Sequence, residues 1–181
     1  MQEHLRQLGI ALIIHTHNNA HYPAREYLDT SISRLMAYGW PAHMLPYTSS
    51  NTTVFRCPST GPEFEGPTNH SPRGYPFPFN IDIGTSRFSH GYNQWGFAAF
   101  SGYGLEAPPG AEVPESRVVN PPDMIALGDS DGNGLFDGDI AFHRIPSPSG
   151  PKPTFPPGNR HKSGANIVFC DGHVEWARQS K

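Results

Sequence analysis

Oxygen-bearing side chains recur at alternate positions between residues 129 and 139, with glycine between them. This is the spacing of the front half of an EF-hand-type calcium loop, in which alternate side chains converge and glycine permits the sharp turn. Carboxylates held so close together would repel one another without a cation. We therefore expect a structural Ca²⁺ whose ligands are Asp129, Asp131, Asn133, the backbone carbonyl of Leu135, Asp137 and, in place of the usual glutamate, Asp139. The alternative is an acidic surface turn without an ion.

Histidine and aspartate residues near the end of the sequence suggest a second site. His161, Asp171 and His173 are of the types that bind zinc or act in hydrolysis. Asp171 is already explained by a turn with Gly172, so we expect His161 to hydrogen-bond the loop from Lys162 to Asn166 instead. The sequence contains no Gly-x-Ser-x-Gly, phosphate-loop or His-Glu-x-x-His motif. We therefore predict that the chain is not an enzyme, with a metal-dependent hydrolase as the weaker alternative.

The two cysteines, Cys57 and Cys170, allow one disulfide. A bridge across so long a loop would strongly restrict the unfolded chain. The alternative is a pair of free, buried thiols. A third interpretation makes either cysteine a nucleophile beside a histidine. We expect the disulfide.

Length and composition indicate one loop-rich domain. The chain has 181 residues, a formal net charge of −3, and 20 prolines and 19 glycines. It shows no basic patch or stripe of the kind that binds nucleic acid, so we expect no such partner. The longest apolar run, Leu8 to Ile14, is much shorter than the roughly 20 residues of a membrane-spanning helix. We therefore expect no membrane span in this chain.

Residues 1–18 have the periodicity of a helix that is apolar over most of its circumference. One small sheet cannot cover such a helix, so neighbouring copies of the chain are expected to bury the remainder. We assign residues 1–22 to an assembly arm and residues 23–181 to a globular α+β domain. The expected assembly contacts are Leu5, Leu8, Ile10, Leu12, Ile13 and Ile14.

The remaining elements are short. The apolar stripe that includes Leu28, followed by Gly39 and Pro41, predicts a second helix over Ser31 to Tyr38. Strands are predicted at residues 52–56, 90–100, 124–127 and 140–144. A hairpin is predicted over Arg160 to Trp176, with Asp171-Gly172 as a two-residue turn. That turn places Cys170 opposite His173 and puts Ile167, Phe169, Val174 and Trp176 on one apolar face.

Two sets of residues are of the kinds that carry an attached glycan or bind a free one. Asn51 and Asn69 lie in glycosylation sequons, although ordinary polar loops are the favoured explanation. An aromatic set along one predicted strand could line a sugar-binding face, but strand aromatics are more often core or interface. The members of this set are Tyr92, Trp95, Phe97, Phe100 and Tyr103.

Several of these motifs resemble those of pseudopilin-like proteins of type II secretion, of the planctomycete and verrucomicrobial kind. The resemblance is carried by His161, nine residues, then Asp171-Gly172, and by four weaker matches in the same order along the chain. Those matches are residues 5–12, 55–59, 90–93 and 118–130. The basic leader and long apolar segment of such proteins do not occur in this sequence.

The resemblance implies a pilin-like fold, in which an N-terminal helix packs on a small antiparallel sheet with long Pro/Gly-rich loops. It also implies a non-enzymatic subunit of an extracellular, pilus-like or pseudopilus-like filament of a bacterium, whose partners are copies of itself in a helical array. The alternative function is a monomeric, calcium-dependent surface module that binds glycans.

Overall fold

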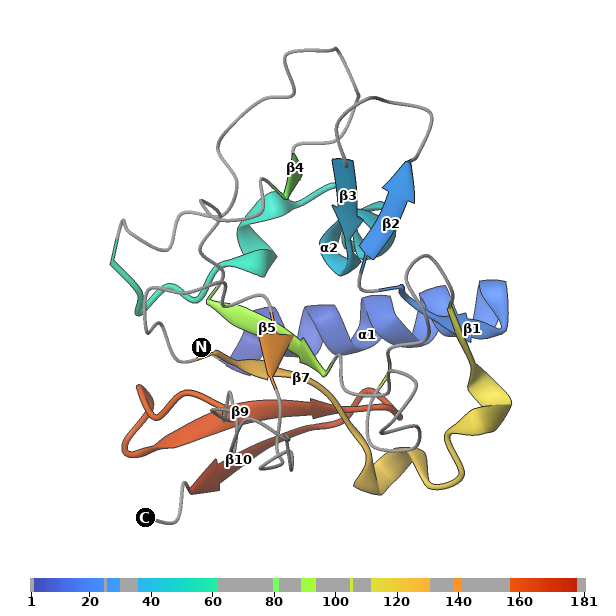
Figure 1. Ribbon diagram of the computed structural model, residues 1–181. Coiled ribbons are helices and arrows are strands. Elements are labelled where there is room, and N and C mark those ends of the chain that lie inside the picture. Colours follow the sequence, from blue (N-terminus) through green and yellow to red (C-terminus); the bar gives the residue numbers. More distant parts are fainter. Residues whose placement is uncertain are drawn as a thin grey trace, which may run out of the picture.

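The computed structural model describes residues 2–24, 26–29, 36–61, 80–81, 89–93, 105, 112–130, 139–140 and 157–178. In these residues an N-terminal helix is combined with short, mainly antiparallel strands (Figure 1). The predicted α+β class is therefore confirmed.

Helix α1 spans Gln2–Asn19, close to the predicted range. Leu5, Leu8 and Leu12 lie three and four residues apart, so they share one side of the helix, and all three are fully buried. The helix ends at Ala20, whose left-handed φ of 59° breaks the helical path while its N–H still donates to the carbonyl of Thr16.

The main sheet of the described residues has the strand order β10-β9-β7-β5-β8. Its centre is β7 (Ile125–Asp129), which pairs antiparallel with β9 (Gly164–Phe169) and β5 (His90–Asn93). At the edges, β10 (Val174–Arg178) pairs antiparallel with β9, and β8 (Asp139–Ile140) pairs parallel with β5. Strands are thus confirmed near each of the last three predicted positions, and α1 packs against β9 and β10.

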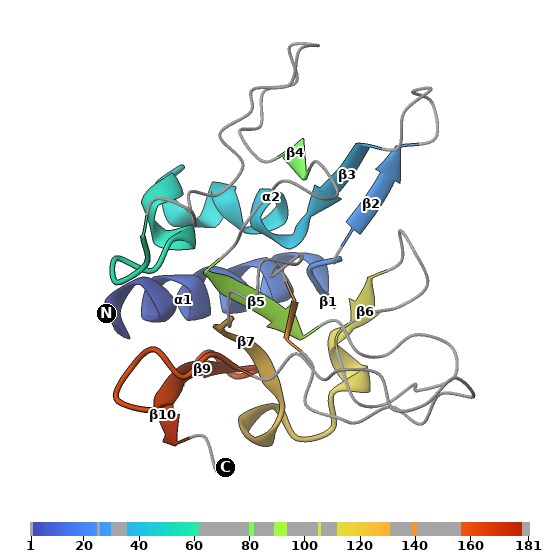
Figure 2. The same cartoon turned by 60° about the vertical axis from the view of Figure 1, so that its left-hand side comes forward.

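A second layer covers α1 on the side away from β9 and β10 (Figures 1 and 2). It consists of α2 (Trp40–Met44) and two 3₁₀ helices, Leu45–Thr48 and Thr52–Phe55, all of which contact α1. The core continues between the layers, where the ring of Trp40 stacks on that of Tyr92 from β5 at 6.0 Å. The chain itself therefore covers two sides of α1, which belongs to the same core as the rest of the described residues.

Two predicted elements are wrong. Residues 36–39 form strand β3 (Met36–Gly39), which pairs with β2 (Glu26–Asp29) and β4 (Asn80–Ile81), so the helix predicted to reach Tyr38 does not form there. Residues 31–35 lie outside the described residues. The strand predicted at residues 52–56 is a 3₁₀ helix, because the side chain of Asn51 caps it by accepting from the N–H of Thr53 at 3.1 Å.

The remaining strand pair is β1 (His21–Tyr22) with β6 (Val113–Pro114). Short 3₁₀ helices at Glu115–Arg117 and Pro121–Asp123 lead from it to β7. No helix within the described part of the chain has the length and apolar character that a bilayer crossing requires.

The C-terminal hairpin exists, but its predicted register is wrong by one residue. Val174 pairs with Val168, and the N–H of Phe169 donates to the carbonyl of His173. The loop therefore has three residues, ending in Gly172 at a φ of +84°, rather than two. Val174 and Trp176 consequently share a face with Val168 and not with Ile167 and Phe169.

Two histidines between α1 and the second layer predict an acid-sensitive stability. Burial lowers the pKa of His15, and the charge of the nearby His43 lowers it further, while Glu112 opposes the shift. Burial likewise lowers the pKa of His43. These two histidines therefore bind protons at higher pH in the unfolded chain than in the folded chain. Their contribution to the stability of the fold is fully present above about pH 6.5 and is lost as the pH falls below that value.

We expect the urea midpoint of unfolding to fall between pH 7 and pH 5, and to fall less in His15→Phe, which keeps an aromatic ring beside His43 and Tyr47. The matched control is His17→Phe, an exposed histidine of the same helix, which should retain the full pH dependence. Equal pH dependence in both variants would contradict the assignment.

Candidate functional site

Asp129, at the end of the central strand β7, is the centre of a buried polar cluster. Its side chain is inaccessible to solvent, and its Oδ2 accepts hydrogen bonds from the backbone N–H of Asn166 at 2.7 Å and from the Nδ2 of the same residue at 3.0 Å. Asn166 lies on the neighbouring strand β9, so the sheet itself fixes the orientation of this carboxylate.

His161 enters the cluster from a tight turn that begins β9. The backbone of His161 exchanges two hydrogen bonds with Gly164, and the intervening Lys162 and Ser163 have left-handed φ values of 55° and 62°. Two consecutive left-handed residues characterise the mirror-image type I′ turn. The Nε1 of Trp176 donates to the carbonyl of His161 at 2.8 Å, so the backbone of His161 is fixed on both sides. The backbone of His161 therefore makes hydrogen bonds to the following loop, as predicted, but its side chain faces Cys57 and Asp129 instead of that loop.

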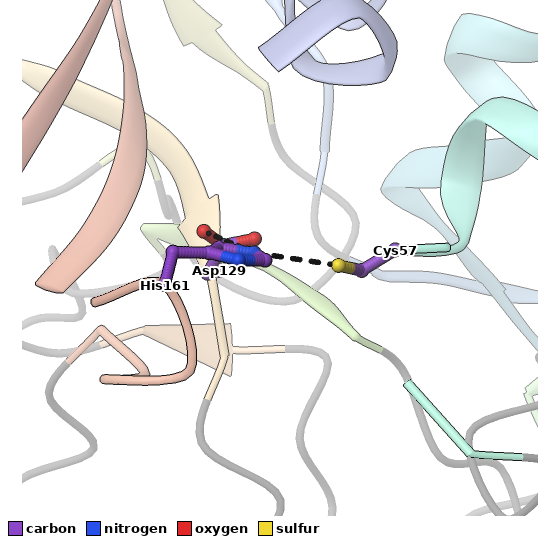
Figure 3. Close-up of side chains that lie close together, drawn as sticks. All are labelled: Cys57, Asp129 and His161. Atoms are coloured by element: carbon purple, nitrogen blue, oxygen red, sulfur yellow. Dashed lines mark hydrogen bonds and ion pairs between the residues drawn. The ribbon is translucent and has the colours of Figure 1, made fainter. Parts of the chain in front are cut away.

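Cys57 reaches the same point from the opposite side, after the 3₁₀ helix Thr52–Phe55 (Figure 3). Its N–H donates to the Oγ of Ser89 at 2.6 Å, and its carbonyl accepts from Thr60. The thiol Sγ lies 3.4 Å from the Nε2 of His161, and the same Nε2 lies 3.3 Å from the Oδ2 of Asp129. Three donor atoms from distant parts of the chain therefore converge on one buried point.

His90, on β5, approaches the other oxygen of the same carboxylate. Its Nδ1 lies 3.4 Å from the Oδ1 of Asp129, and it is 1% exposed. Burial lowers the pKa of His90, although the adjacent Asp129 opposes that shift. Burial alone would raise the pKa of the Asp129 carboxyl, but the hydrogen bond and charge of His90, the N–H of Asn166 and the charge of His161 together hold it below its usual range. The site therefore favours an ionised carboxylate.

The geometry does not match a nucleophilic triad. In such a triad the two ring nitrogens of histidine serve different partners, the nucleophile and the carboxylate. Here Cys57 and Asp129 both face Nε2, while Nδ1 of His161 has no hydrogen-bond partner in the described part of the chain. Thiolate, imidazole and carboxylate are instead ligands that bind a transition metal together, and within the described residues this is the group of three that is close enough to do so.

Comparisons of this chain with protein-family models, with curated proteins and with solved structures find no match.

The calcium ligands predicted from the sequence are not assembled in the described residues. The side chain of Asp129 lies in the buried cluster, where it contacts Asn166 and His161. For Asp139 the structure describes only the backbone, in β8. The other predicted ligands, Asp131, Asn133, Leu135 and Asp137, lie outside the described residues. Calcium binding by this segment stays a prediction.

The hydrolytic trio predicted from His161, Asp171 and His173 does not form a common site. Asp171 and His173 pair with each other at the exposed hairpin turn, with 2.5 Å between Oδ1 and Nδ1, whereas His161 belongs to the buried cluster. The predicted disulfide is not formed either, because Cys57 and Cys170 are both free, buried thiols. Burial raises the pKa of the Cys170 thiol to about 12, which argues against this residue as a nucleophile.

The predicted assembly residues divide into two groups. Leu5, Leu8 and Leu12 are buried in the core of their own chain, so the expectation that they contact other subunits is wrong. The remaining three are exposed by 60%, 38% and 40%, and we call them the isoleucine face: Ile10, Ile13 and Ile14.

The glycan-related residues are only partly described. Tyr92 is fully buried and donates its hydroxyl to the carbonyl of Pro23, so it cannot contribute to a sugar-binding surface. Asn51 is exposed at its 3₁₀ helix. The other candidates, Asn69, Trp95, Phe97, Phe100 and Tyr103, lie outside the described residues.

The motif that carries the resemblance to pseudopilin-like proteins consists of His161 and Asp171-Gly172, and each of its residues has a separate physical role. His161 belongs to the buried cluster, and Asp171 accepts the N–H of His173 within the turn. Gly172 supplies the positive φ and lies directly against α1, where a Cβ would approach Ile13 to 2.7 Å. In return, a Cβ on Gly9 would meet the carbonyl oxygen of Gly172 at 2.4 Å. The helix and the turn therefore touch backbone to backbone.

The sequence suggests a separate role for each of the three residues: a disulfide for Cys57, a calcium loop for Asp129 and a hydrolytic site for His161. It does not mark His90 as a site residue. No local pattern joins these residues, because each arrives on a different element. The available signal was chemical: a cysteine, an aspartate and two histidines placed at the ends of predicted strands and turns are a typical donor set for a metal.

Proposed function

We propose that this chain is a non-enzymatic structural subunit that assembles with copies of itself, through the isoleucine face of α1, into an extracellular pilus-like filament. The observation that carries the proposal is this face. Its residues are spaced three and four apart, so they form one strip along α1 that stays partly exposed, with Ile13 at its border against the hairpin turn. A monomer gains nothing by holding three large apolar side chains in water on one strip.

A second copy is the partner that these observations favour. The strip has little net charge, since the nearest charges on its N-terminal side, Glu3 and Arg6, pair with each other at 3.9 Å. Such a strip complements an identical strip without leaving an unpaired charge between them. The resemblance of the chain to pseudopilin-like proteins, which pack through their first helix, supports the same partner.

The buried cluster supports the non-enzymatic part of the proposal. Cys57, Asp129 and His161 are at most 6% exposed, so a substrate has no direct approach to them. The aromatic evidence for the alternative, a glycan-binding module, is weakened by the burial of Tyr92.

The test is the association of the purified chain, followed by light scattering after size exclusion and by electron microscopy. We expect concentration-dependent polymers, and roughly 30-fold weaker association in the double variant Ile10→Ser/Ile14→Ser, because about 2 kcal/mol of apolar burial is lost from each contact. The matched control is Val119→Ser, which removes a 95% exposed apolar side chain outside α1 and should leave association unchanged. A wild-type chain that stays monomeric at millimolar concentration, or a double variant that polymerises normally, would refute the proposal.

A further inference from the structure

The buried cluster leaves several polar atoms without the partners that burial normally requires. In the described part of the chain, the Nδ1 of His161 and the Nε2 of His90 have no hydrogen-bond partner, while the Nδ1 of His90 and the Oδ1 of Asp129 face only each other, at 3.4 Å. Each of these residues is more than nine-tenths buried. Groups of this kind in a native interior call for a specific explanation. They mark the cluster as unusually polar, whereas the atoms placed to bind an ion are other atoms of the same residues, the Nε2 of His161 and the Oδ2 of Asp129, together with the Sγ of Cys57.

Two of the three separations within the cluster fit the edges of a metal coordination sphere, and all three ligand atoms lie within 4.8 Å of one another. With a Zn–S bond of about 2.3 Å and Zn–N and Zn–O bonds of about 2.0–2.1 Å, neighbouring ligands of a tetrahedral site lie about 3.3–3.6 Å apart. The observed separations are 3.4 Å between the Sγ of Cys57 and the Nε2 of His161, and 3.3 Å between that Nε2 and the Oδ2 of Asp129. A direct charge-assisted hydrogen bond would be shorter, at about 2.7–2.9 Å.

We propose that Cys57, Asp129 and His161 bind one Zn²⁺ ion with a structural role. A single ring nitrogen that faces both the thiol and the carboxylate is expected when all three ligate one ion, and on binding the thiol releases its proton to solvent. Asn166 orients the carboxylate through two hydrogen bonds, and His90 faces its second oxygen, which is the kind of outer support that metal ligands receive. The described residues supply three ligands, and the fourth position of a tetrahedral site is not assigned.

The ion would join parts of the chain that are far apart in sequence. Cys57 follows the second layer, Asp129 ends the central strand, and His161 begins the turn into β9. Zinc would therefore stabilise the attachment of the second layer to the sheet. This inference is independent of self-assembly, because the isoleucine face contributes no ligand.

The first experiment measures zinc content by mass spectrometry after the full chain has been stripped with a chelator, dialysed against ZnCl₂ and freed of unbound metal. We expect one zinc per chain in the wild type and none in Cys57→Ser or His161→Gln. The matched control is Cys170→Ser, which removes the other buried cysteine and should keep the zinc. The proposal would be overturned if the wild type held no zinc, or if Cys57→Ser held as much zinc as the wild type.

The second experiment does not depend on the folding of a variant. The wild-type chain loaded with Co²⁺ should show the thiolate-to-metal charge-transfer absorption and the intense visible bands of a tetrahedral site. Its melting temperature should also rise with Zn²⁺ concentration. A cobalt spectrum without thiolate character, or a melting temperature that responds to Ca²⁺ and not to Zn²⁺, would exclude this site.

Discussion

Replacing Asp129 with alanine is expected to lower the free energy of unfolding by about 3–5 kcal/mol, measured by urea denaturation at pH 7 in the presence of a chelator. The carboxylate is fully buried and receives two hydrogen bonds from Asn166, while His90 and His161 lie 3.4 Å and 3.3 Å from its oxygens. Alanine would leave buried donors of Asn166 without an acceptor, and each such donor costs about 1–3 kcal/mol.

The conservative variant Asp129→Asn separates charge from shape. It keeps an oxygen for Asn166 but loses the negative charge that faces both histidines, so we expect a smaller but measurable loss. The matched control is Asp123→Ala, which removes an exposed carboxylate just before β7 and should change stability by no more than about 0.5 kcal/mol. A loss below about 1 kcal/mol in Asp129→Ala would mean that the cluster contributes little to the fold.

Replacing Gly9 with alanine should destabilise the protein by about 1–3 kcal/mol, the usual cost of overpacking. The sign is informative, because at a free position inside a helix the same change stabilises by about 1 kcal/mol. The new Cβ would lie 2.4 Å from the carbonyl oxygen of Gly172 and 3.2 Å from the Cγ1 of Val168. Since the nearest atom belongs to the backbone, a side-chain rotation cannot relieve the clash, and α1 and the hairpin turn must separate.

The control for this prediction is Asn18→Ala, an exposed position in the last turn of the same helix. It should be neutral or slightly stabilising, because alanine is the better helix former. Thermal unfolding of both variants provides the measurement. A melting temperature of Gly9→Ala at or above that of the wild type would contradict the backbone contact.

Helix α1, the hairpin and the strands at β5 and β7 could be predicted because local signals determine them. Leucines at helical spacing placed α1, and a glycine-containing turn between two apolar runs placed the hairpin. The hairpin register could not be predicted in the same way. Asp171-Gly172 favours a two-residue turn, but the contact of Gly172 with Gly9 belongs to the tertiary structure, and the observed three-residue loop places the positive φ of Gly172 at its end.

Strand β3 and the cluster could not be predicted from local patterns. Residues 36–38 were assigned to a helix from a short apolar stripe, but pairing with β2 and β4 makes them a strand, which is the usual way in which tertiary context overrides propensity. Cys57, Asp129 and His161 meet only because the sheet order brings β7 beside β9 and the second layer over α1. Asp129 had a plausible local role in a calcium loop, which concealed its role in the cluster.

The contact between Gly9 and Gly172 also bears on how the chain reaches its folded state. These residues are roughly 160 positions apart, and pairings across such distances are formed late and slowly. During synthesis, α1 would emerge long before β9 and β10, so its leucines would have no sheet to pack on until those strands were made. A nascent chain of this topology could cover α1 with the second layer early, but the side of α1 that faces β9 and β10 would stay open until those strands were made.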